Sequence, residues 1–256
     1  MGSRLDQINV FLESNQIKQK EIKAITSDAS FRRYFRVADK ILMDADPTLV
    51  DDLDAFINVD NILINMNLNA PKIYSIDKEN GFLLLEDLGD ALFSKVLNIN
   101  NEENLYKKAI DILVHLHGRN INQSSKNNLI ENYSDEKLLA ECELFIEWYI
   151  KSYLNINISE NQINEFKQIF SKIIISLNFT YDTLVLRDFH VDNLVLHQSK
   201  FGLQQVGLLD FQDAVLGSSS YDLISLIEDV RRPISIELRT SLINYFIELT
   251  GYDPEQ

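Results

Sequence analysis

The sequence predicts an α+β fold, with a small antiparallel sheet near the N-terminus followed by a larger, mainly helical part. Two observations lead to this prediction. Short apolar runs separated by turn signals fill residues 21–44 and 72–85, a pattern typical of neighbouring antiparallel strands. Beyond residue 100, apolar residues recur at helical spacing over long stretches.

The N-terminal elements follow in order from this patterning. Apolar residues at helical spacing predict a helix over 5–15, and residues 21–44 predict two or three strands. Residues 51–67 carry an apolar helical stripe with acidic residues in the first turn, where they suit the helix dipole. Two further strands are expected over 72–76 and 82–85.

The larger part alternates long helices with three very short strands. Five helices are expected over residues 101–119, 136–153, 159–177, 221–231 and 234–249. Ser159 is a plausible N-cap for the third of them. The short apolar runs at residues 184–186, 194–196 and 206–209 predict the strands.

Three polar side chains stand at the ends of these short strands. Asp188 and Asn193 belong to the loop between the first two runs, and Asp210 ends the third. Carboxylate and amide oxygens suit Mg²⁺, which takes few protein ligands and leaves room for water and phosphate oxygens. The step from Asp188 to Asn193, followed by a strand-borne Asp-Phe, has the spacing of a kinase catalytic loop and its metal-binding Asp. Simple turn-capping would explain neither the spacing nor the clustering.

The motif Arg187-Asp188-Phe189-His190-x-x-Asn193 resembles the catalytic loop of the aminoglycoside phosphotransferases and choline kinases. Four other phrases resemble one branch of that superfamily, the bacterial N-acetylmuramate/N-acetylglucosamine anomeric kinases. They lie at residues 28–36, 42–45, 81–89 and 209–226. The likeness covers nearly the whole chain.

This resemblance implies a two-lobed, protein-kinase-like fold and an ATP-dependent small-molecule kinase. Residues 1–89 would form the nucleotide-binding N-lobe, and residues 90–256 the catalytic and acceptor-binding C-lobe. Asp188 would be the catalytic base, while Asn193 and Asp210 would hold Mg²⁺. ATP and Mg²⁺ are the implied cofactors, and the anomeric hydroxyl of an amino sugar is the implied acceptor in cell-wall recycling.

The resemblance also suggests nucleotide contacts in the N-lobe. The turn with Ser27 and Ser30 falls where related folds cover the phosphates, although it contains no glycine and an ordinary β-turn remains an equal alternative. Arg32, with Arg33 and Arg36 beside it, is expected to supply positive charge. Glu86 and Leu88 lie in the segment whose main chain receives adenine in the family. Met43 occupies the position where many relatives carry a phosphate-contacting lysine, so no such lysine is expected.

Candidate acceptor contacts are His190, Asp213, Glu143 and Trp148. For His190, bracing of the loop is an equal alternative to donation toward the sugar. For Trp148, core packing on an amphipathic helix is as well supported as stacking on a pyranose.

Composition excludes several classes of partner. The 39 acidic residues against 24 basic ones give a net charge of −15, which opposes general affinity for nucleic acid or anionic membranes. No apolar run approaches the ~20 residues of a membrane span. The single cysteine, Cys142, fits a reducing compartment. From the composition we therefore expect a cytoplasmic protein. The resemblance implies a small-molecule sugar as its partner, and we expect a monomer.

Three alternatives to this sugar kinase remain open from the sequence. One is a kinase of another hydroxyl acceptor, such as an aminoglycoside or choline. Another is a nucleotide-binding module without turnover, which the absent lysine and the glycine-free turn would suit. A metal-dependent hydrolase built on His190, Asp192 and Asp210 lacks a paired metal-ligand motif. Relatives in the branch continue through another helical segment beyond the equivalent of Gln256, which leaves either a more open pocket or an incomplete chain.

Overall fold

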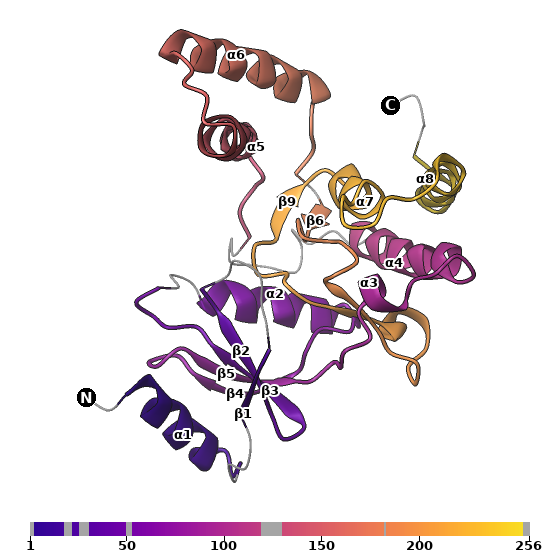
Figure 1. Cartoon of the computed structure of the whole chain (residues 1–256). Coiled ribbons are helices and arrows are strands. Elements are labelled where there is room, and N and C mark those ends of the chain that lie inside the picture. Colours follow the sequence, from indigo (N-terminus) through magenta and orange to yellow (C-terminus); the bar gives the residue numbers. More distant parts are fainter. Residues whose placement is uncertain are drawn as a thin grey trace.

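A computed structural model describes residues 3–17, 22–25, 31–49, 53–118, 130–181 and 183–252. Figure 1 shows a twisted sheet with a helix on each side, and next to it a cluster of helices and short strands. A pair of helices, α5 and α6, stands away from that cluster.

The N-terminal sheet has five antiparallel strands in the order β1-β2-β3-β5-β4. Its strands are β1 (Ile22–Ile25), β2 (Arg33–Val37), β3 (Lys40–Asp44), β4 (Ile73–Asp77) and β5 (Phe82–Glu86). Side chains alternate between the two faces of a strand. Leu42 and Leu84 accordingly pack with α1 (Arg4–Ser14), whereas Met43, Leu83 and Leu85 join the cluster that contains α2 (Leu53–Asn65). The strands and helices predicted for this part are confirmed.

The C-terminal part packs helices around two short antiparallel strand pairs. Its helices are α3 (Phe93–Val96), α4 (Glu102–His117), α7 (Ser220–Ile227) and α8 (Ile236–Thr250). One antiparallel pair joins β6 (Thr183–Val185) to β9 (Val215–Gly217), and the other joins β7 (Leu194–Leu196) to β8 (Val206–Leu208). The short helix η3 (Gly202–Gln205) precedes β8. The largest buried cluster contains residues of α2, β3 and β5 together with residues of α4, β7, β8, α7 and α8. The two parts of the chain therefore share one core.

Two predicted helices differ from the structure. The helix expected over 221–231 ends at Ile227, because Asp229 then forms a turn in which its Oδ1 accepts the N–H of Arg231 at 2.9 Å. The helix expected over 136–153 is α5 (Asp135–Leu144), which continues as a π-helix, η2 (Phe145–Tyr153). Single π-helical turns are frequent at functional sites.

The outer hairpin consists of α5, η2 and α6 (Glu160–Leu177). Ser159, the predicted N-cap of α6, forms a capping box with Gln162. The hairpin is poorly buried: α5 has no buried residue, and only Ile174 is buried on α6. Trp148 is 69% exposed, so the alternative of core packing for this side chain is wrong. No helix in the described part of the chain combines the length and the hydrophobicity that a bilayer crossing requires.

The turn before β5 gives a stability prediction. Gly81 has a φ of +72°, and a Cβ added there would lie 1.9 Å from the carbonyl oxygen of Ala45. A side chain in the left-handed region costs roughly 1–2 kcal/mol, and overpacking typically adds about 1–3 kcal/mol. We expect Gly81→Ala to lower the free energy of unfolding by about 2–5 kcal/mol in urea denaturation.

Gly251→Ala is the matched control for this experiment. Gly251 also has a positive φ, of +70°, but a Cβ added there would meet no described atom within 4 Å. This variant should show only the backbone cost of about 1–2 kcal/mol. Equal losses in the two variants would rule out the contact with Ala45 as a cause.

Candidate active site

The two short strand pairs bring Asp188, Asn193 and Asp210 together. Asn193 donates from Nδ2 to the main-chain oxygen of Asp188 at 2.9 Å, and the main-chain oxygen of Asn193 accepts the N–H of Leu209 at 3.0 Å. Asp210 follows directly after Leu209. Burial raises the pKa of Asp188, and the negative charge of Asp210 raises it further. The loop before β7 and the end of β8 therefore form one polar site.

Two residues of this site adopt a left-handed backbone conformation. Arg187 has a φ of +68° and Asp210 a φ of +55°. Non-glycine residues in sparsely populated regions cost about 1–3 kcal/mol each and tend to cluster at functional sites. The left-handed backbone at both positions sets the directions in which the carboxylates of Asp188 and Asp210 leave their adjacent loops. Other contacts must offset the energetic cost of this conformation.

Asp222 supplies the main contact. This fully buried side chain, on α7, accepts the N–H of Leu186 at 2.7 Å and the N–H of Arg187 at 2.9 Å. Burial raises its pKa to about 7, and the two N–H donors oppose that shift. Asp222 thus holds the loop that carries Asp188 through two backbone hydrogen bonds.

Asp210 is positioned through its neighbours. Phe211 is buried and stacks on Phe56 of α2, with ring centroids 5.0 Å apart. Gln212 donates from Nε2 to Oδ1 of Asp210 at 2.9 Å and to Oδ2 of Asp213 at 3.0 Å. Oδ2 of Asp210 has no hydrogen-bond partner among the described residues, and Gln212 also holds the carboxylate of Asp213 next to that of Asp210.

The donor set fits a magnesium ion. Asn193 uses its amide nitrogen to bond Asp188, which leaves its Oδ1 for a cation, and Asp210 has its Oδ2. Mg²⁺ is often held by one or two carboxylates while it keeps water and phosphate oxygens as further ligands. Among the described residues, no three His, Cys, Asp or Glu side chains gather as a metal cluster, so the hydrolase alternative gains no support.

His190 lies within the loop and is nearly buried, with 8% of its surface exposed. Its Nε2 is 3.2 Å from Nδ2 of Asn193. Burial lowers the pKa of His190, and the charge of Arg231 lowers it further. A neutral, enclosed imidazole in contact with Asn193 favours loop bracing over a contact with the sugar.

Of the three expected arginines, two are engaged elsewhere. Arg33 forms an ion pair with the buried Asp44 at 2.5 Å, and Arg36 binds both Asp87 and Asp90. Arg36 is therefore neutralised by two carboxylates and does not supply the positive charge expected of it, whereas Arg33 shares the one carboxylate of Asp44 with Arg4. The charge of Arg32 lowers the pKa of the Tyr34 phenol, against the larger effect of burial, which raises it. Ser27 and Ser30 lie outside the described residues.

The segment after β5 has an open main chain. Neither the N–H nor the C=O of Leu88 forms a hydrogen bond with any residue that the structure describes. Its side chain is buried against Gly207, where an added Cβ would lie 2.9 Å from Leu88 Cδ1. Oε1 of Glu86 lies 3.6 Å from Nζ of Lys200, and Oε2 of Glu86 accepts the main-chain N–H of Lys72. The main-chain groups of Leu88 thus have no partner among the described residues, whereas the Glu86 side chain has other partners.

Two acceptor candidates lie on the outer hairpin. Glu143 pairs with Lys167 at 2.7 Å within the hairpin itself, and Trp148 points largely to solvent. No contact in the described part of the chain ties either residue to Asp188. The residue that does reach the loop is Glu141, whose Oε1 lies 2.5 Å from Nη2 of Arg187.

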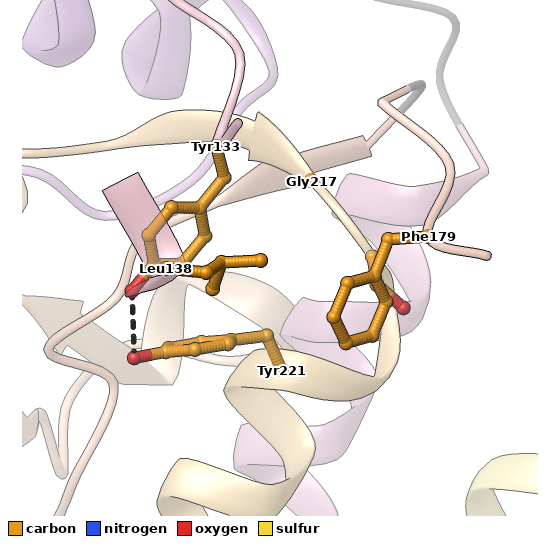
Figure 2. Close-up of a pocket in the computed structure, with 6 residues that line it drawn as sticks. Tyr133, Leu138, Phe179, Gly217 and Tyr221 are labelled. Atoms are coloured by element: carbon orange, nitrogen blue, oxygen red, sulfur yellow. Dashed lines mark hydrogen bonds between the residues drawn. The ribbon is translucent and has the colours of Figure 1, made fainter. Parts of the chain in front are cut away.

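Glu141 belongs to a network that sequence reasoning missed. The hydroxyl of Tyr133 bonds both Glu141 and, at 3.0 Å, the hydroxyl of Tyr221 (Figure 2). The cavity beside these rings measures about 10 Å³, close to the room one water needs. It is far too small for a nucleotide or a sugar. The network instead connects α5 and α7 with Arg187, the residue before Asp188.

The chain is similar in sequence to known phosphotransferases. A sequence profile of the phosphotransferase enzyme family matches residues 21–256. The chain belongs to this family. N-acetylmuramate/N-acetylglucosamine kinase of Pseudomonas putida is 32% identical over 241 residues, covering 88% of this chain and 68% of the relative. The protein of the same name from Pseudomonas aeruginosa is 31% identical over 242 residues, covering 89% and 68%.

Solved structures of other phosphotransferases share the fold. A gentamicin complex of an aminoglycoside phosphotransferase superposes with a TM-score of 0.71 at 17% identity, over 96% of this chain and 81% of the other. The choline kinase LicA of Streptococcus pneumoniae gives 0.60 at 16% identity, over 98% and 93%. The two-lobed, protein-kinase-like fold predicted for this phosphotransferase is confirmed.

The role of Asp222 can be tested by stability measurements. Asp222→Ala would leave two buried N–H groups without an acceptor, at about 1–3 kcal/mol each. We expect the free energy of unfolding to fall by about 2–6 kcal/mol, and by less for Asp222→Asn, which keeps one acceptor oxygen.

Asp39→Asn is the control, since Asp39 is 83% exposed and its change should stay within about 0.5 kcal/mol. If Asp222→Ala unfolded at the same denaturant concentration as the parent protein, the two N–H groups would not depend on this carboxylate.

Proposed function

We propose that this phosphotransferase is an ATP-dependent sugar kinase that phosphorylates the anomeric hydroxyl of N-acetylmuramate or N-acetylglucosamine in cell-wall recycling. The observation that carries the proposal is the convergence of Asp188, Asn193 and Asp210 on adjacent loops. It occurs in a chain whose curated relatives are named as kinases of these two sugars.

Asp188 accepts the proton of the acceptor hydroxyl as the oxygen attacks the γ-phosphorus of ATP. The bond between that phosphorus and the β,γ-bridging oxygen breaks, and the products are ADP and a sugar 1-phosphate. The raised pKa of Asp188 suits this role, because a general base works best when its pKa lies closer to the working pH.

Asn193 and Asp210 provide the metal site. Their free oxygens would hold Mg²⁺ next to Asp188. The ion would neutralise charge on the β- and γ-phosphates during transfer. The Gln212 bond and the Phe211 stack fix the Asp210 carboxylate in advance, so less of the binding energy is used to order it.

The main chain of Leu88 would receive the adenine ring, because its N–H and C=O are unpaired among the described residues. Arg32 would face the phosphates, with Ser27 and Ser30 in the preceding turn. On the acceptor side, Asp213 is the best supported of the four candidates, since Gln212 places it beside Asp210.

The runner-up acceptors are aminoglycosides and choline, which are named in the structures that share the fold. The net charge of −15 suits such cations better than the anionic N-acetylmuramate. Charge over a whole surface is nevertheless a weak guide to one local site. The higher identity to the sugar kinases therefore decides our preference.

Two further features complete the proposal. ATP as donor and a single cysteine fit a cytoplasmic location. All the proposed catalytic groups come from one chain, so a monomer would be sufficient for activity.

Asp188→Asn should lose roughly 10²- to 10⁴-fold in turnover while it keeps its affinity for ATP. The substitution preserves shape and removes the proton acceptor. Steady-state ADP release and ATP titration measure the two quantities. Asp192→Asn in the same loop is the matched control, because Asp192 is 41% exposed and pairs with Arg231 instead. Near-normal turnover of Asp188→Asn would place the base elsewhere.

Incubation with ATP, Mg²⁺ and each acceptor in turn tests the substrate. The panel contains N-acetylmuramate, N-acetylglucosamine, kanamycin and choline, and ³¹P NMR locates the transferred phosphate. We expect an anomeric phosphate on one or both amino sugars. Phosphate on another hydroxyl, or only on kanamycin or choline, would refute the assignment of the sugar substrate. The proposal that the protein is a kinase would still stand. ATP binding without any transfer would favour a non-catalytic module.

A further inference from the structure

Arg187, the residue before Asp188, has a side chain that joins three segments of the chain. Its Nη2 lies 2.5 Å from Oε1 of Glu141 on α5, and its Nη1 lies 3.4 Å from the main-chain oxygen of Asp213. The guanidinium also lies over the ring of Tyr133, 5.4 Å from the ring centre. The loop that carries Asp188 is thus attached to the outer hairpin by a charged side-chain contact.

Glu141 is also held at its other oxygen. Its Oε2 is bonded to the hydroxyl of Tyr133, which lies 3.0 Å from the hydroxyl of Tyr221 on α7 (Figure 2). The next residue of α7, Asp222, accepts the main-chain N–H of Arg187 at 2.9 Å. Neighbouring residues of α7 therefore fix the backbone of Arg187 directly, and its side chain through Tyr133 and Glu141.

Tyr133 gives this chain of contacts a rigid base. Only 3% of its surface is exposed, its N–H donates to the main-chain oxygen of Leu216 on β9 at 2.7 Å, and its ring meets the ring of Tyr221 edge to face. Leu138 packs against the same cluster and lies three residues before Glu141 on α5. Residues three apart share one face of a helix. The face of α5 that carries Glu141 is therefore the face that meets Tyr133.

The pair of Glu141 and Arg187 matters more for geometry than for stability. The two side chains are 33% and 31% exposed, and an ion pair that water screens adds little to stability. Arg187, however, has a φ of +68° and is fixed both at its N–H and at its guanidinium. A residue held at both ends in this way gives the following Asp188 a defined direction.

We propose that Glu141 is a positioning residue for the catalytic base, which acts through Arg187 to fix the direction of the Asp188 carboxylate. The inference rests on the proposed function, which makes Asp188 the base. It gives α5 a part in the transfer step without requiring α5 to touch the acceptor.

Glu141→Gln keeps the size of this side chain and removes its charge. A misplacement of about 1 Å in a reacting group costs on the order of 100-fold in rate. We therefore expect kcat to fall about 10- to 100-fold, while the KM values for ATP and for the acceptor stay within about twofold. Steady-state ADP release measures both quantities, with the acceptor of the panel above that takes phosphate.

Arg187→Met tests the route of the effect. Methionine keeps an unbranched apolar stem beside Tyr133 and removes the guanidinium. If Glu141 acts through that group, adding Glu141→Gln to Arg187→Met should lower kcat no further, because residues that act as a unit are not additive. A further fall as large as that of Glu141→Gln alone would show that Glu141 acts independently of Arg187, and would overturn the inference.

Glu136→Gln is the matched control, since Glu136 lies on the same helix and is exposed. This variant should keep the kcat and KM of the parent protein. Urea denaturation of each variant separates positioning from folding: we expect Glu141→Gln to unfold at nearly the same urea concentration as the parent. A fall in kcat that only matched a loss of folded protein would make Glu141 a structural residue and overturn the inference.

The remaining outcomes separate this inference from the proposed function. A parent-like kcat in Glu141→Gln would overturn the inference alone. A raised acceptor KM with unchanged kcat would make Glu141 an acceptor contact, and would overturn the positioning role as well. A parent protein that transfers phosphate to no acceptor of the panel would overturn the kinase, and with it the base that Glu141 positions.

Discussion

The pair of hydrogen bonds from the backbone of Leu186 and Arg187 to Asp222 is the constraint on which the active-site geometry depends. Arg187 is held in a left-handed conformation just before the candidate base. Without a buried acceptor at the start of α7, the loop would relax toward a commoner backbone conformation. The direction of Asp188, and with it the spacing to Asn193 and Asp210, follows from a side chain that never meets substrate.

Much of this arrangement was predictable, because its signals are local in the sequence. Asp188, Asn193 and Asp210 each lie at the end of a short apolar run, and such runs identify strands without knowledge of their partners. The family phrases around them made the order of the lobes predictable as well. The turn at Asp229 was missed for the opposite reason, since its contact to Val191 joins residues 38 positions apart.

The errors share the same origin. Arg33 and Arg36 were expected to face phosphates, but their carboxylate partners lie 11 and 51 residues away in the sequence. Likewise, the pairing of Glu141 with Arg187 depends on how the outer hairpin joins the body, which no periodicity encodes.

The cluster shared by the two lobes has a mechanical consequence. Phe56 of α2 stacks on Phe211, the residue after Asp210, so the helix behind the N-terminal sheet touches the chain segment that carries the candidate metal ligand. Two lobes joined only by a linker can swing freely about it. Lobes that interdigitate through buried rings must slide past one another in small steps, as in shear motions of packed helices. A movement of one lobe against the other would then carry Asp210 and α2 together, and the candidate metal site would change its shape with every such movement.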